Sequence, residues 1–100
     1  MIIVTGSVTA KPGSFEALLE ASLAHVHRSR SEDGCISHAV RIDSEEPLKL
    51  VFFEEWRDIA ALQTHFVTPG IKELLAAFRE HSDTSEPITT YEATKLPALG

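Results

Sequence analysis

Hydrophobic positions along the chain follow two periods in turn, and their order predicts a domain of strands and helices. A period of two, typical of half-buried strands, runs over residues 2–10, 35–43, 48–56 and 87–96. A period near 3.6, typical of amphipathic helices, runs over residues 15–30, with shorter helices expected over 58–66 and 69–78. Asp58 and the pair Thr68-Pro69 are suitable start signals for the two shorter helices. The order β-α-β-β-α-β predicts an α+β, ferredoxin-like fold with a four-stranded antiparallel sheet.

The third predicted strand is apolar on both faces, which bears on assembly. It reads Leu50-Val51-Phe52-Phe53, so both sides of the sheet should be covered. In a ferredoxin-like fold both helices lie on one face and leave the other open. A second copy of the chain is the natural cover for that open face. We therefore expect a homodimer that forms through the open face of the sheet, with two sheets packed face to face.

Length, charge and composition limit the remaining possibilities. One hundred residues with 43% apolar side chains predict a single folded domain over residues 1–100. The formal charge of -6 argues against a nucleic-acid partner, which requires a basic surface. The apolar runs are far shorter than the roughly 20 residues that cross a bilayer, so no membrane partner is expected. The one cysteine, Cys35, is expected to be buried and inert, and it fits the reducing cytoplasm.

The segment from Phe52 to His65 holds the strongest candidates for chemistry. Glu54 and Trp56 are two residues apart on a strand and share the face of Phe52. A carboxylate among large apolar side chains is costly unless it is paired or used. His65 is the candidate base, because imidazoles titrate near neutral pH. Glu54 could orient His65 or anchor a substrate hydroxyl. The alternative is a purely structural role for all three residues. In that case Glu54 binds backbone amides or Arg41, Trp56 fills the core and His65 caps its helix.

The other histidines give a less specific signal. His38 lies on the second strand and could act as a second acid–base group in the pocket, or make a polar contact in the dimer interface. Three further histidines lack an i, i+4 partner and a cysteine cluster, so we expect surface positions for His25, His27 and His81. The five glycines form no nucleotide or phosphate fingerprint. The sequence therefore predicts no metal site and no cofactor site.

Five segments along the chain carry a family resemblance, in this order: Thr9 to Gly13, Ser29 to Cys35, Glu54 to Trp56, Ala60 to Leu62, and His65 to Pro69. They resemble motifs of the antibiotic biosynthesis monooxygenase family of dimeric α/β-barrel proteins. One position departs from the quinol-monooxygenase type, where many relatives carry a histidine after the Thr-Pro pair; here it is Gly70. Another, often tyrosine in the second strand, is His38.

The resemblance implies an oxygenase that uses no flavin, haem or metal. An electron-rich quinol or polycyclic phenol is deprotonated and passes an electron directly to O₂. The protein then supplies a dry aromatic pocket, a base and donors for the oxyanion. His65 or His38 is the candidate base. The expected substrate-binding residues are Trp56, Phe52, Phe66 and Phe78, with Phe53 and Tyr91 as further possible walls.

Three alternatives remain open at this point. Haem-degrading proteins of the same fold place a histidine further along the second helix and an asparagine in the first strand, where this chain has Ser7. A small-metabolite isomerase or lyase would need several polar groups in the pocket. A non-catalytic dimeric ligand-binding module, acting in a stress response, would leave the acid–base residues pointing away from the pocket.

Overall fold

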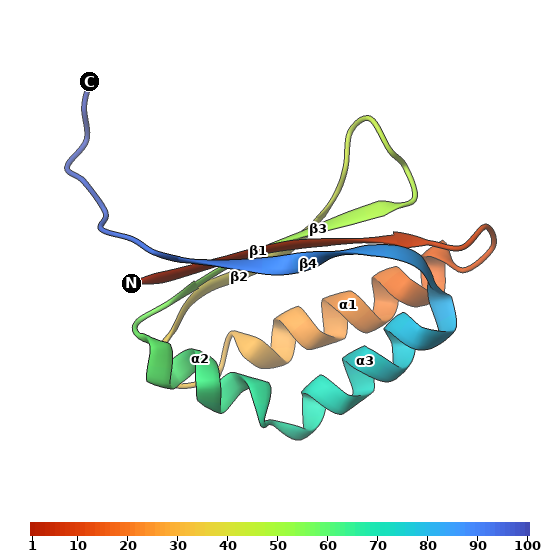
Figure 1. Cartoon of the computed structure of the whole chain (residues 1–100), viewed down its shortest axis with the longest axis horizontal. Helices are drawn as coiled ribbons and strands as arrows, with labels where there is room; N and C mark the ends of the chain where they lie inside the picture. The colour runs from red at the N-terminus through yellow and green to blue at the C-terminus, as the bar shows by residue number, and fades with distance from the viewer.

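The computed structural model describes residues 1–100 and contains four strands and three helices (Figure 1). In chain order they are β1 (Ile2–Ala10), α1 (Phe15–Ser29), β2 (Cys35–Ile42), β3 (Lys49–Trp56), α2 (Ile59–Phe66), α3 (Pro69–His81) and β4 (Ser82–Glu92). The strands form one antiparallel sheet in the spatial order β2-β3-β1-β4. This confirms the predicted ferredoxin-like α+β fold, with the short α2 preceding α3.

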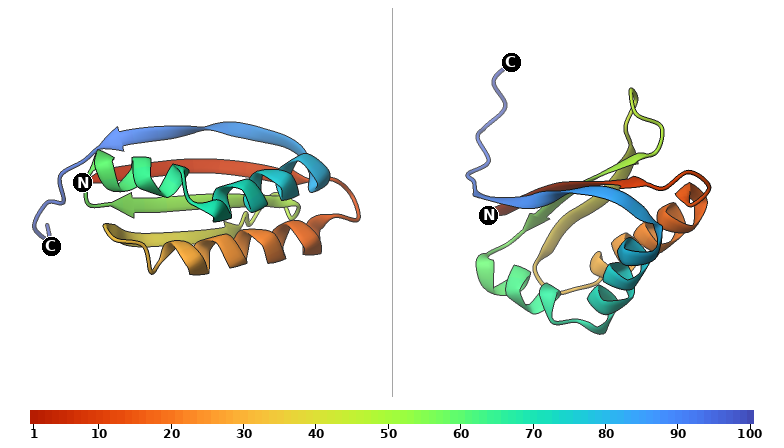
Figure 2. Two further views of the ribbon diagram at one scale, coloured as in Figure 1. Left: turned by 90° about the horizontal axis from the view of Figure 1, so that it is seen from below. Right: turned by 45° about the vertical axis from the view of Figure 1, so that its right-hand side comes forward.

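The helices form a single layer against one face of the sheet, and the opposite face is open (Figures 1 and 2). The core between the two layers consists of two groups of buried side chains. One includes Val8, Ala10, Leu18, Val26, Leu50 and Phe52, and the other Val4, Trp56, Ala61 and Leu62. None of the helices combines the length and apolar character that a membrane crossing needs.

Local signals explain where α2 and α3 begin. The Asp58 carboxylate accepts a hydrogen bond from the backbone N–H of Ala61 at 2.9 Å, which caps α2 as predicted. Pro69 occupies the first turn of α3, where its missing N–H costs nothing. Gly34, just before β2, has a φ of +84°, and a Cβ there would lie 2.5 Å from the Ala61 Cβ. Glycine is thus required at the point where the chain passes beneath α2.

The position of β4 differs from the prediction. We expected a strand over residues 87–96, but the strand runs Ser82–Glu92 and follows α3 without a loop. Its first half is polar and exposed, because β4 is an edge strand, so hydrophobic alternation did not reveal it. Pro87 lies at a register shift opposite β1, between the pairs Ser7↔Glu86 and Thr5↔Thr89. A bulge is one of the few places where a strand accepts proline.

The buried face of α1 contains a histidine that was predicted to lie at the surface. Its buried positions are Leu18, Ser22, His25, Val26 and Ser29. Leu23 is 38% exposed, whereas His25, expected at the surface, is only 3% exposed. The surface assignment of His25 was therefore wrong. Apolar periodicity did not reveal His25, because the buried face of α1 also contains the polar residues Ser22 and Ser29.

The open face of the sheet carries a mixture of apolar and polar side chains. The strand register places Ile3 beside Tyr91, and Thr5 beside Phe53. Phe53 is 38% exposed and Tyr91 is 52% exposed. Large apolar side chains are thus gathered on a face that no element of the chain covers.

Candidate functional site

A cavity of about 290 Å³ lies between the sheet and the layer formed by α2 and α3. Its lining is mainly apolar, with a few polar groups from the sheet, α1 and α2. The lining residues are Gly6, Ser7, His25, Phe52, Glu54, His65, Phe66, Ile71, Leu74, Leu75, Phe78, Ser85, Glu86 and Ile88. An apolar cavity with a few convergent polar groups is the usual form of a small-molecule site.

His65 is held in the cavity wall by a carboxylate that sequence reasoning did not identify. The His65 Nδ1 lies 2.8 Å from the Oε1 of Glu32, in the connection after α1. A carboxylate can only accept, so this contact assigns the proton to Nδ1 and leaves Nε2 with a free lone pair. The Trp56 ring packs against the imidazole at a centroid distance of 4.6 Å. His65 is 1% exposed, so both its orientation and its tautomer are fixed.

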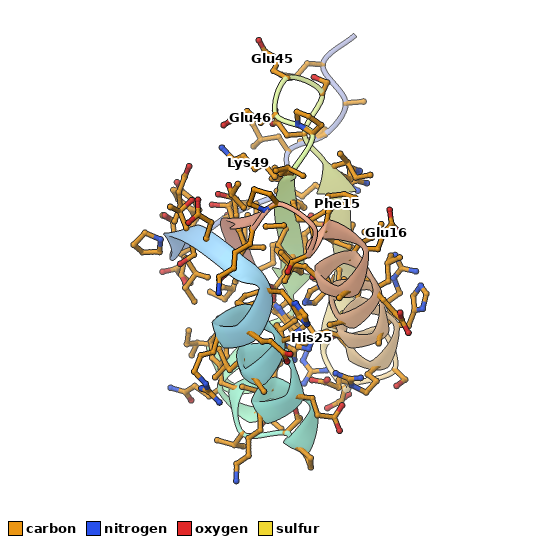
Figure 3. All side chains as sticks on the ribbon, turned by 90° about the vertical axis from the view of Figure 1, so that its right-hand side faces the viewer. Phe15, Glu16, His25, Glu45, Glu46 and Lys49 are labelled. Atoms are coloured by element: carbon orange, nitrogen blue, oxygen red, sulfur yellow. The ribbon has the colours of Figure 1, made fainter.

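Three buried histidines from three different elements meet beside the cavity. His25 of α1, His38 of β2 and His65 of α2 have ring centroids 5.0 to 5.7 Å apart. Figure 3 shows His25 directed into the interior between the helices. Burial, together with the neighbouring His38 and His65 rings, lowers the pKa of His25 from 6.5 to about 4. His25 is therefore neutral at physiological pH.

Glu54 lies on β3 beside this histidine cluster. Its Oε1 accepts a hydrogen bond from the Trp56 indole N–H at 2.9 Å and lies 3.3 Å from His38 Nε2. Burial acts to raise the pKa of Glu54, but the His38 ring and the Trp56 N–H outweigh it and hold the pKa below its ordinary value. Glu54 thus stays ionised. Its hydrogen-bond partner is Trp56 and its charged-group neighbour is His38, rather than Arg41.

The structure brings most of the predicted site residues together, with four exceptions. Phe53 and Tyr91, predicted as further walls, lie on the open face of the sheet and not in the cavity. His65, Glu54, Phe52, Phe66 and Phe78 line the cavity. His38 and Trp56 are buried behind the cavity wall, 2% and 0% exposed, and do not line it. Trp56 therefore supports His65 and Glu54 from behind.

Sequence reasoning missed His25 and Glu32. The spacing Leu18, Ser22, His25, Ser29 was the available signal for His25, since i+4, i+3 and i+4 steps keep one helical face. Glu32 carried no comparable local signal.

Two other predicted features have simple structural explanations. Cys35 is half-buried, and its burial, with the nearby Glu32 carboxylate, raises the pKa of its thiol. The thiol is therefore protonated and unreactive, although less buried than predicted. At Gly70, a Cβ would lie 2.6 Å from the Nε of Arg28, whose guanidinium donates to the Gly70 carbonyl at 3.3 Å. Arg28 thus fills the space that a side chain at position 70 would take.

Comparison with known proteins agrees with this architecture. Residues 1–77 match the family model described as antibiotic biosynthesis monooxygenase. The chain belongs to this family. A candidate antibiotic biosynthesis monooxygenase from Deinococcus radiodurans has a crystal structure that superposes with a TM-score of 0.92 at 26% identity, covering 100% of this chain and 99% of the other. The resemblance inferred from the motifs is therefore confirmed, together with the fold.

Two other proteins are similar in sequence to most of this chain. Uncharacterized protein sll1783 of Synechocystis is 40% identical over 74 residues, which are 74% of this chain and 50% of the relative. The chain thus spans about half the length of that protein. YgiN of Escherichia coli, named a probable quinol monooxygenase, is 29% identical over 82 residues, covering 72% of this chain and 79% of YgiN.

Proposed function

We propose that this chain is a cofactor-independent monooxygenase that oxidises a quinol or a small polycyclic phenol in the cavity beside His65. The observation that carries the proposal is the Glu32–His65 pair in the wall of an apolar cavity. A buried imidazole with a carboxylate on Nδ1 and a free lone pair on Nε2 is arranged to accept a proton. Family membership and the relationship to YgiN support the same reaction class.

The reaction begins with transfer of a phenolic proton to His65 Nε2, which makes the ring electron-rich. The anion gives one electron to O₂, and the resulting substrate radical and superoxide couple to form a C–O bond. His65 then returns its proton as the O–O bond breaks and water leaves. The substrate loses two hydrogen atoms and gains one oxygen atom, and the second oxygen atom of O₂ becomes water. The substrate itself supplies all of the electrons.

The other groups at the cavity have distinct roles in this scheme. The neutral His25 ring, whose pKa is about 4, is a poor base near neutrality, but it can donate a hydrogen bond to the developing oxyanion. Glu54 can accept from a second substrate hydroxyl, because its carboxylate lines the cavity. Phe52 and Phe78, whose rings are 6.1 Å apart, provide apolar walls. His38 is a weaker candidate for the base, since it does not border the cavity.

Cavity size limits the choice of substrate. About 290 Å³ is at the lower end of the range for small-molecule sites. A two-ring naphthoquinol therefore fits better than a four-ring polyketide.

Oxygen consumption by chelator-treated protein tests the proposal. A panel of benzoquinols, naphthoquinols and anthrones would be compared in wild type, His65→Ala and the control His27→Ala, which alters an exposed histidine of α1. We expect uptake with at least one naphthoquinol, a drop of about tenfold or more in His65→Ala, equal to ~1.4 kcal/mol of barrier, and no change in His27→Ala. Equal rates in wild type and His65→Ala would remove His65 from the mechanism.

The assembly expected from the sequence belongs to the same proposal. A homodimer packed through the open sheet face would cover Ile3, Phe53 and Tyr91, which are otherwise left on an uncovered surface. It would also brace β1 and β3, the strands beneath the cavity. A chain that sediments as a monomer at micromolar concentration would contradict this assembly.

A further inference from the structure

The three-histidine cluster has a property that proton transfer does not require. One nitrogen of each ring, in His25, His38 and His65, lies within 4.8 Å of a nitrogen in each of the other two rings. All three side chains are buried, at 3%, 2% and 1% exposure. Each comes from a different element, so the protein fold itself holds the rings together. Buried imidazoles that face one another without a shared partner need an explanation.

His38 supplies independent evidence for a missing ligand. Neither of its ring nitrogens has a hydrogen-bond partner, although the side chain is completely buried. Its Nε2 is 3.3 Å from Glu54 Oε1, but the two atoms lack the alignment of a hydrogen bond. Leaving a buried polar group unpaired destabilises the folded state. A bound cation would satisfy this ring.

We propose that His25, His38 and His65 form a binding site for one divalent transition-metal ion of the Zn²⁺ class. Imidazole nitrogen is a preferred ligand for Zn²⁺ and for Co²⁺, and three histidines with one open position form a known type of zinc site. Zinc–nitrogen bonds of about 2.0–2.1 Å in a tetrahedral site separate the nitrogens by roughly 3.4 Å. Since the nitrogens lie within 4.8 Å of one another, they need to approach by at most roughly 1.4 Å to bind one ion.

The surroundings of the cluster suit a cation. The Glu32 carboxylate on His65 Nδ1 is the outer partner that orients a metal-binding histidine and fixes its free nitrogen. The Glu54 carboxylate beside His38 supplies a negative charge that attracts a cation. The Arg28 guanidinium is a positive charge near His25 and acts in the opposite direction. His25, His65 and Glu54 border the cavity, which gives the ion a path from solvent.

Metal binding would affect the proposed reaction in a defined way. The ion would bind His65 through Nε2, and in the proposed reaction Nε2 is the atom that accepts the substrate proton. Zn²⁺ is therefore expected to inhibit oxygenation, and this second effect rests on the proposed function. Binding itself does not depend on that function.

Titration of the wild-type protein with Co²⁺ and Zn²⁺ tests the site directly. The visible absorption of Co²⁺ reports its ligands, and isothermal titration calorimetry with Zn²⁺ gives stoichiometry and affinity. We expect one ion per chain, with affinity at least tenfold weaker in His25→Gln, His38→Gln and His65→Gln. Glu32→Gln should weaken binding by about tenfold or more. The controls His27→Gln and His81→Gln alter histidines outside the cluster and should bind like wild type.

A measurement on unmodified protein covers the case of variants that do not fold. Long-range ¹H–¹⁵N NMR of wild-type imidazoles should show Zn²⁺-dependent shifts in three rings, while those of His27 and His81 stay in place. Absence of binding, unchanged affinity in the folded cluster variants, or shifts confined to His27 and His81 would overturn the site. Metal binding without any O₂ uptake would support the metal site and refute the proposed function. O₂ uptake without metal binding would support the proposed function and refute the metal site.

Discussion

Mild acid should destabilise this protein through His25, a buried histidine in the middle of α1. Burial and the neighbouring imidazoles lower the pKa of His25 from 6.5 to about 4 in the folded state. In the unfolded chain the same ring titrates near its ordinary value. Between these two values the unfolded state holds more protons, so the free energy of unfolding falls as the pH falls.

The magnitude follows from the two pKa values. A fall from 6.5 to about 4 corresponds to ~3 kcal/mol once both states are protonated, which is reached below about pH 4. Between about pH 7.5 and about pH 5, this one group should remove ~2 kcal/mol of stability. That is a large share of the total stability of a small domain, which is typically about 5–15 kcal/mol.

Urea unfolding at a series of pH values, in the presence of a chelator, measures this effect. Wild type would be compared with His25→Gln, which has no ionisable ring at this position, and with His27→Gln on the exposed side of the same helix. The His25→Gln curve should be flatter than that of wild type by ~2 kcal/mol between about pH 7.5 and about pH 5. His27→Gln should run parallel to wild type.

Parallel curves for wild type and His25→Gln would refute the reasoning. They would mean that the His25 ring is either solvated or able to take up a proton without penalty. A wild-type free energy of unfolding that does not change over this pH range would lead to the same conclusion. Glu54 cannot mask the effect of His25, because its lowered pKa also reduces stability as the pH falls, and does so at still lower pH.

Three further predictions test other parts of the structure. Glu32→Gln should lower kcat with a quinol by about tenfold or more, since the amide no longer fixes the His65 tautomer, and an unchanged kcat would contradict this role. Gly13→Ala should lower the free energy of unfolding by about 1–2 kcal/mol, because residue 13 has a φ of +85° and no atoms near its Cβ position. Gly34→Ala should lower it further in urea unfolding, because the new Cβ would also meet Ala61, and equal losses would contradict this packing. Phe53→Glu should yield monomers in sedimentation analysis, while Leu23→Glu, equally 38% exposed on α1, should leave the dimer intact.

The fold was largely predictable because its signals are local. Alternation along residues 2–10 and 48–56, the Asp58 cap and the Thr68-Pro69 start each depend on neighbouring residues alone. The start of β4 was not predictable in this way. Its residues pair along an exposed edge, so their strand conformation is fixed by β1 rather than by burial of their own side chains.

Site residues were predictable only where the sequence of a single strand or helix made them stand out. Glu54 and His65 were identified because each breaks an apolar pattern beside the single tryptophan. His25 was missed because its burial depends on how α1 is rotated on the sheet, and the buried face includes the polar positions Ser22 and Ser29. Glu32 was missed because its partner is 33 residues away in the sequence, and only the packing of α2 against the α1–β2 connection brings them together.

The most direct test of the central claim is ¹⁸O₂ labelling of the product formed from a naphthoquinol by chelator-treated protein. The account predicts one ¹⁸O atom in each product molecule, one O₂ consumed for each product, and loss of both signals in His65→Ala. A product without ¹⁸O, or O₂ consumption no faster than in buffer across the quinol panel, would contradict it.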